Sequence, residues 1–176
     1  IKDKVQGKTM VEAALEINHW CAGEVMYQGT DMRTGSALEI YRSGVGRCGE
    51  EAVFVVNVMR SAGIPARPVY VPRWSHCDDN HAWVEVWCDG DWHYLGACEP
   101  EAVLDKGWFT NAASRAMMIG SRWYDRAMPD EKVIGKDGMN RIINLLGKYA
   151  KTRWITITVE DLDGTPAAGA KVRAEV

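Results

Sequence analysis

Two stretches of the chain carry hydrophobic patterns that predict helices. Between residues 9 and 27, apolar side chains recur at helical spacing and Gly23 acts as a breaker, which predicts an amphipathic helix. From Cys48 to Ala62 almost every position is apolar, until a Gly-Ile-Pro sequence ends the run. This run is too long for a single strand, so we predict a buried helix in spite of its β-branched residues. Cys48 then lies in the first turn of that helix.

The central third predicts antiparallel strands. Residues 67–71 form a short strand signal, and a polar loop follows over residues 72–80. Residues 81–87 alternate large or polar side chains with small apolar ones, Asp89-Gly90 is a strong two-residue turn signal, and residues 92–98 form the return strand. The expected product is a hairpin that follows this strand and loop in the chain.

The hairpin register places chemistry on one face. A two-residue turn at Asp89-Gly90 pairs Trp87 with Trp92 and His81 with Cys98. Because side chains alternate across a strand, His81 shares its face with Trp83, Glu85 and position 96, which is a glycine.

The two ends of the chain look different from its centre. Residues 129–141 contain Pro, Gly and Asp and are predicted as a loop. Residues 154–159 alternate like a strand, and a second short strand stops at Val176; two strands alone are rarely stable. The first residue is Ile1, without an initiator Met or a signal sequence, so we expect a fragment of a longer protein. We therefore predict one main domain over residues 1–150 and the first strands of a second module over residues 151–176.

Composition excludes several classes of function. Hydrophobic residues make up 47% and charged residues 26% of the 176 positions, and the net charge is -3, so nothing calls for nucleic acid or an anionic membrane. No apolar run is long enough to span a bilayer. The five cysteines are an odd number without paired CxxC spacing, which indicates neither a disulfide framework nor a zinc ribbon. We expect no cofactor and no metal, and the oligomeric state is not indicated.

Cys48 has the surroundings of a reactive thiol. An ordinary cysteine, with a pKa of about 8.5, is mostly protonated at neutral pH, so a nucleophilic cysteine needs a nearby positive charge or base. The predicted helix N-terminus, Arg47 and a histidine could supply both. Gly46 and Gly49 leave room for a substrate carbonyl, and backbone N–H groups of the first turn could hold an oxyanion. The best candidate for the base is His81, at the start of a strand after a polar loop.

Three segments together resemble the core of the transglutaminase-like superfamily. They are Gly46-Arg47-Cys48-Gly49-Glu50, the helix exit from Ala62 to Arg67, and His81-Ala82-Trp83-Val84-Glu85-Val86, and the resemblance covers residues 9–110. It implies a bacterial member with an α+β, papain-like fold, in which a helix bearing the cysteine packs on an antiparallel sheet. It also implies a Cys-His-Asp triad, with Cys48 as nucleophile and His81 as general base and acid.

The third member of the triad is missing from its expected position. In the family, an Asp lies four residues beyond a Trp on the strand after the histidine, and counting from Trp92 that position is Gly96. We select Glu99 as the orienter, although its parity is wrong unless the strand ends or bulges after Ala97. Asp78, Asp79, a water molecule or a backbone carbonyl are the alternatives.

Aromatic residues suggest a substrate surface, and also a second reading. Trp20 and Trp83 are candidates for substrate binding, although such residues more often belong to a core or a cleft wall. A non-catalytic binding module would keep the fold and grip a ligand with Trp74, Trp83 and Tyr94. A metal site on the hairpin between residues 76 and 98 is a smaller possibility, because its His, Cys and Asp residues lack zinc-finger spacing.

The sequence thus predicts thiol-dependent acyl transfer or hydrolysis on a peptide or glycopeptide amide, with a cell-wall peptide as a further substrate candidate. Residues 151–176 resemble the start of an Ig-like or prealbumin-like β-sandwich found in extracellular bacterial proteins. An extracytoplasmic location is therefore expected.

Overall fold

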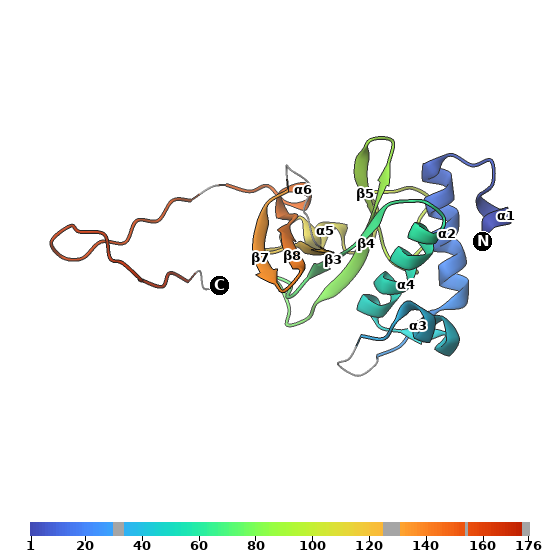
Figure 1. Cartoon of the computed structure of the whole chain (residues 1–176), viewed down its shortest axis with the longest axis horizontal. Helices are drawn as coiled ribbons and strands as arrows, with labels where there is room; N and C mark the ends of the chain where they lie inside the picture. The colour runs from blue at the N-terminus through green and yellow to red at the C-terminus, as the bar shows by residue number, and fades with distance from the viewer. Residues whose placement is uncertain (30–33, 125–130, 154, 174–176) are drawn as a thin grey trace.

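A central antiparallel sheet separates two groups of helices in the computed structural model, which describes residues 1–29, 34–124, 131–153 and 155–173. Figure 1 shows α2 and α4 on one side of the sheet and α5 and α6 on the other. The helices are α1 (Lys2–Val5), α2 (Met10–Glu24), α3 (Ala37–Ser43), α4 (Cys48–Ser61), α5 (Thr110–Ala113) and α6 (Leu146–Tyr149).

The sheet has six strands in the order β5-β4-β3-β6-β8-β7. Neighbouring strands are antiparallel throughout, and a separate parallel pair, β1 (Met26–Tyr27) and β2 (Val45–Gly46), precedes α4. The bounds of the six strands are β3 (Ala66–Val71), β4 (His81–Cys88), β5 (Asp91–Leu95), β6 (Gly120–Tyr124), β7 (Val133–Asp137) and β8 (Asn140–Asn144).

Local sequence explains where the main helices begin. Thr9 caps α2 in a reciprocal capping box with Glu12, and Ser36 does the same for α3 with Glu39. The predicted helices at 9–27 and 48–62 are confirmed as α2 and α4. The apolar run of α4 is buried between α2, α3 and the sheet, which overrides the weak helix preference of its valines.

Alternation along β4 gives the sheet two different faces. Val84, Val86 and Cys88 point into the core beneath α4. Trp83 points to the opposite face and belongs to a second core, which includes residues of α5 and β8. His81 shares the face of Trp83, as the predicted register requires. The turn at Asp89-Gly90 is also confirmed, with positive φ at both residues and Trp87 opposite Trp92.

Two strand predictions were wrong. The return strand ends at Leu95 rather than at Cys98, because the chain turns between Gly96 and Glu99. The loop expected at 129–141 contains β7 and the start of β8, joined by a turn with Gly138 at φ 57, while residues 129 and 130 lie outside the described residues. These strands carry mostly exposed or half-buried side chains, so the sequence has no alternation of apolar residues that would predict them.

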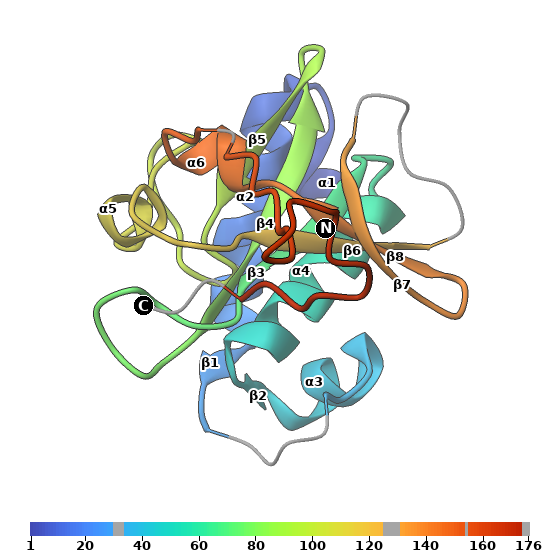
Figure 2. The same cartoon turned by 90° about the vertical axis from the view of Figure 1, so that its left-hand side faces the viewer.

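The described part of the C-terminal segment is almost entirely exposed. Between residues 151 and 173 it contains one isolated bridge, Glu160 to Pro166, and no named strand. Figures 1 and 2 show it leaving the sheet after α6. Trp154 and residues 174–176 lie outside the described residues, so a β-sandwich module over 151–176 stays a prediction.

Candidate active site

Cys48 is the first residue of α4 and is half-buried. Burial raises the pKa of its thiol above the ordinary value, and the backbone N–H groups of Ala82 and Gly49 act against this effect. The charge of Glu51 raises this pKa further, and the charge of Arg47 lowers it by a smaller amount. The contact with Ala82 shows that the thiol reaches the start of β4. In this resting structure the cysteine is therefore close to its expected partner but favours the protonated form.

A cleft of about 210 Å³ joins Cys48 to His81. Its walls come from three elements: the start of α4, the end of β3 and the start of β4. The lining residues are Arg47, Cys48, Gly49, Tyr70, Val71, Pro72, Asn80, His81 and Ala82. The structure thus brings together the two residues that sequence analysis selected as nucleophile and base. Among the described residues no hydrogen bond joins them.

Aromatic rings enclose His81, which is only 6% exposed. Its ring centroid lies 4.6 Å from Trp108, 5.0 Å from Phe109, 5.9 Å from Trp83 and 6.3 Å from Trp74. Burial lowers the pKa of the imidazole to about 4, and the charge of Asp79 acts weakly in the other direction. The imidazole is therefore neutral at pH 7 and able to accept a proton.

The carboxyl group of Glu99 lies next to the His81 imidazole, on the side where the family's triad has its carboxylate. Its Oε2 lies 3.9 Å from His81 Nε2, which is within ion-pair range but too long for a hydrogen bond. Both atoms are buried and have no hydrogen-bond partner among the described residues. Trp108 Nε1 donates to the other carboxylate oxygen at 3.0 Å. Two buried polar atoms that face each other at this distance are arranged to form a hydrogen bond after a small movement.

A tight turn carries Glu99 into this place. The Glu99 N–H donates to Gly96 O at 3.2 Å, and Cys98 adopts a positive φ of 55°. Buried Asn18 on α2 holds the turn from both sides: its Nδ2 donates to Gly96 O at 2.9 Å, and its Oδ1 accepts from Cys98 N–H at 3.0 Å. The early end of β5 therefore removes the parity objection to Glu99.

The missing side chain of Gly96 makes room for Glu99. A Cβ atom at position 96 would lie 2.3 Å from Glu99 Oε2 and 2.8 Å from its Cβ, much closer than atoms can approach. The carboxyl group of Glu99 thus occupies the space into which a side chain at 96 would point. Of the two aspartate alternatives, Asp78 is exposed and pairs with Arg73 at 3.4 Å. Asp79 is also exposed and its side chain accepts from Asn80 N–H, although its charge raises the pKa of His81.

The two tryptophans considered for substrate binding do not line the cleft. Trp83 is fully buried beneath His81, so a substrate-contacting role is not supported by its position. Trp20 is half-buried between Tyr41 and Phe54, with ring centroids 6.1 Å from each. Both residues act in this structure as packing groups that support α4 and β4.

Sequence reasoning missed three residues around the site: Asn18, Glu51 and Trp108. Asn18 could have been noticed as a polar residue on the apolar side of its helix. Glu51 is 4% exposed on α4, and burial together with the charge of Glu99 raises its carboxyl pKa to about 8. Trp108 lies in a segment without periodicity, so no pattern pointed to it.

The described residues contain no group of three His, Cys, Asp or Glu side chains that could hold a metal. A metal site on the hairpin therefore has no support from the geometry. In the same part of the chain, no helix has the length and apolar character needed to cross a membrane.

Residues 1–97 match the family model of the transglutaminase-like superfamily, which is more than half of the chain. This protein therefore belongs to the transglutaminase-like superfamily. A search of curated proteins found no match.

Solved structures of bacterial proteins are similar to this chain. A candidate protease of Parabacteroides distasonis superposes with a TM-score of 0.51 at 17% identity, over 68% of this chain and 24% of its own. Legionella pneumophila LapG gives 0.47 at 17% identity over 58% and 61% of the two chains, and a candidate cysteine protease of Cytophaga hutchinsonii gives 0.43 at 20% identity over 75% and 51%. The chain thus spans 61% and 51% of the lengths of the latter two structures. The α+β, papain-like core expected from the sequence is confirmed.

Proposed function

We propose that this protein carries out thiol-dependent acyl transfer or hydrolysis on a peptide or glycopeptide amide. The observation that carries the proposal is the convergence of Cys48 and His81 on one cleft, with the Glu99 carboxylate 3.9 Å behind the imidazole. Membership of the transglutaminase-like superfamily adds support. A cell-wall peptide is a further substrate candidate, and an extracytoplasmic location stays a prediction.

The chemistry begins with a neutral thiol and a neutral imidazole. The sulfur of Cys48 attacks the carbonyl carbon of the amide while His81 takes the thiol proton, and backbone N–H groups at the start of α4 face the developing oxyanion. When the C–N bond breaks, His81 returns this proton to the leaving nitrogen. Water or an amine then attacks the thioester, His81 takes the proton of this nucleophile, and the proton returns to the sulfur as the acyl group leaves. Glu99 orients the imidazole and stabilises its charged form.

Acetylation by p-nitrophenyl acetate tests the pair directly. At pH 6 we expect Cys48 to be acetylated at least about tenfold faster than the exposed Cys77, because a positioned base takes the proton during attack. Mass spectrometry of the peptides gives both rates in one sample. His81→Ala should reduce the rate at Cys48 and leave that at Cys77 unchanged. Equal rates at the two cysteines, unaffected by the variant, would contradict the proposal.

The pKa of His81 gives a second expected result. An imidazole with a pKa lowered to about 4, rather than 6.5, stays neutral through mildly acidic pH, so acetylation of Cys48 should persist down to about pH 5. NMR titration of the imidazole measures the pKa itself. Because burial sets this value, Cys48→Ala should titrate at nearly the same pH. A high pKa in the unmodified protein that falls in Cys48→Ala would instead show a thiolate–imidazolium pair at rest.

A non-catalytic binding module is the second candidate. It is favoured by the raised pKa of Cys48 and by the lack of a hydrogen bond between His81 Nε2 and any residue that the structure describes. Trp74 and Trp83 are both 5% exposed or less and belong to the core. A ligand of such a module would therefore contact the cleft rather than these two rings. Slow acetylation of Cys48 at every pH, combined with peptide binding in the cleft, would decide for this function.

A further inference from the structure

A second hollow of about 480 Å³ lies on the α4 side of the sheet, beyond the cleft of Cys48. Its size is in the range of small-ligand sites. α4 packs on β3 and β4, and β6 is the next strand, so the hollow lies where the helical layer ends and the sheet continues. Its described walls include Asn57 and Arg60 of α4, Pro68 of β3, and Arg122 and Tyr124 of β6.

The hollow and the cleft lie along the same faces of α4 and β3. On α4, Gly49 lines the cleft, whereas Val53 and Asn57, four and eight residues later, line the hollow; this spacing keeps them on one helix face. On β3, Tyr70 lines the cleft and Pro68 lines the hollow, two residues apart on one sheet face. Eight helical residues span about 12 Å, which is the length of about four residues of an extended peptide.

The charge of the hollow is positive. Arg60 and Arg122 line it, and no carboxylate does so among the described residues. Arg122 is exposed and makes no hydrogen bond or ion pair with the described part of the chain, whereas Arg60 Nε donates to Ala66 O at 2.9 Å. The chain as a whole has a net charge of -3, so this site differs from the average surface. A guanidinium at the wall of a hollow, with no partner among the described residues, is suited to bind a carboxylate.

We propose that this hollow is a subsite for an acidic side chain of an extended peptide, about four residues from the amide held at Cys48. The inference rests on the proposed peptide substrate and specifies its class. Arg122 supplies the main charge contact, and Tyr124 and Pro68 contact the peptide stem.

Fluorescence anisotropy with fluorescein-labelled hexaglutamate amide tests the subsite in the Cys48→Ala protein, which cannot turn a substrate over. We expect hexaglutamate to bind more tightly than labelled hexaglutamine, and Arg122→Gln to weaken hexaglutamate binding about tenfold, as for the loss of one hydrogen bond to a charged group. Arg115→Gln is the matched control, because it removes an equal charge from an exposed arginine that follows α5 and does not line the hollow.

Three outcomes would overturn the subsite: equal weakening by both arginine variants, equal binding of the two peptides, or no binding of hexaglutamate. The acetylation of Cys48 is measured independently. If acetylation occurs and hexaglutamate binding fails, only the subsite is wrong. If hexaglutamate binds through Arg122 and Cys48 is inert, the protein is a peptide-binding module.

Discussion

Gly96→Ala is expected to slow the acetylation of Cys48 by on the order of 10- to 100-fold, because a displacement of about 1 Å at a catalytic group has effects of that size. The new Cβ would lie 2.3 Å from Glu99 Oε2, so the carboxylate must leave its place behind His81. Gly23→Ala is the control, because its Cβ would meet nothing within 4 Å. The rates come from mass spectrometry with p-nitrophenyl acetate.

Two double variants separate loss of orientation from general damage. Gly96→Ala combined with Glu99→Gly should react no more slowly than Glu99→Gly alone, because the side chain that the new Cβ would meet is then absent. Gly96→Asp combined with Glu99→Gly places a carboxylate at the position where the family pattern expects it, and should recover part of the rate that Glu99→Gly loses. If Gly96→Ala alone leaves Cys48 fully reactive, Glu99 does not orient His81.

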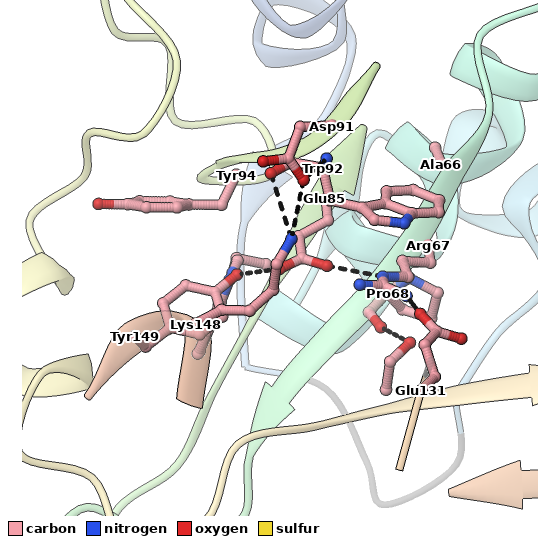
Figure 3. A network of polar contacts seen from close by, with 12 residues as sticks. Ala66, Arg67, Pro68, Glu85, Asp91, Trp92, Tyr94, Glu131, Lys148 and Tyr149 are labelled. Atoms are coloured by element: carbon pink, nitrogen blue, oxygen red, sulfur yellow. Dashed lines mark hydrogen bonds and ion pairs between the residues drawn. The ribbon is translucent and has the colours of Figure 1, made fainter. Parts of the chain in front are cut away.

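Arg67→Met is expected to lower the free energy of unfolding by about 3 to 5 kcal/mol, the usual cost of removing one partner from a buried ion pair. Arg67 Nε donates to Glu85 Oε2 at 2.6 Å, and both side chains are 2% exposed or less. Figure 3 shows that the guanidinium also meets Glu131 and lies under the Trp92 ring, 4.1 Å from its centroid. Urea unfolding followed by tryptophan fluorescence measures the change.

The same region offers a matched surface pair. Lys148 Nζ lies 3.5 Å from Asp91 Oδ1, and both residues are partly or well exposed, so Lys148→Met should cost no more than about 1 kcal/mol. Adding Glu85→Gln to Arg67→Met removes the deeply buried charge of Glu85, which has then lost Arg67, and should recover part of the lost stability. A loss in Arg67→Met no larger than that in Lys148→Met would show that the buried pair contributes little.

The network around Arg67 and Glu85 is also connected to His81 in the candidate active site. Tyr149 OH donates to Glu85 Oε1 at 2.7 Å and accepts from Trp83 Nε1 at 2.9 Å, and the Trp83 ring stacks beneath His81. Burial, together with the neighbouring Glu85 carboxylate, raises the pKa of Tyr149 well above its ordinary value, so its proton stays available for this bond. Tyr149, the last residue of α6, thereby fixes the Trp83 ring that packs against the candidate base.

The sequence predicted the central elements because their patterns are local. The apolar run of α4, the alternation of β4 and the Asp89-Gly90 turn each follow from short-range physics, and together they place Cys48 and His81. The end of β5 could not be predicted in the same way. It depends on Asn18, 78 residues before Gly96 in the chain, whose side chain supplies the hydrogen bonds of the turn. The half-exposed strands β7 and β8 likewise show no apolar alternation in the sequence, because they are held by backbone pairing with each other rather than by burial of their side chains.

The space shared by positions 96 and 99 has a consequence for how this site could change by mutation. A side chain at 96 and the carboxyl group of Glu99 exclude each other sterically, so neither position can be exchanged freely while the other stays fixed. A path from a carboxylate on the strand to one on the turn must first empty position 96, which leaves an intermediate without an orienter. The two positions should therefore change together in evolution. Homologues that share this turn should carry the acidic residue at one of the two positions and not at both.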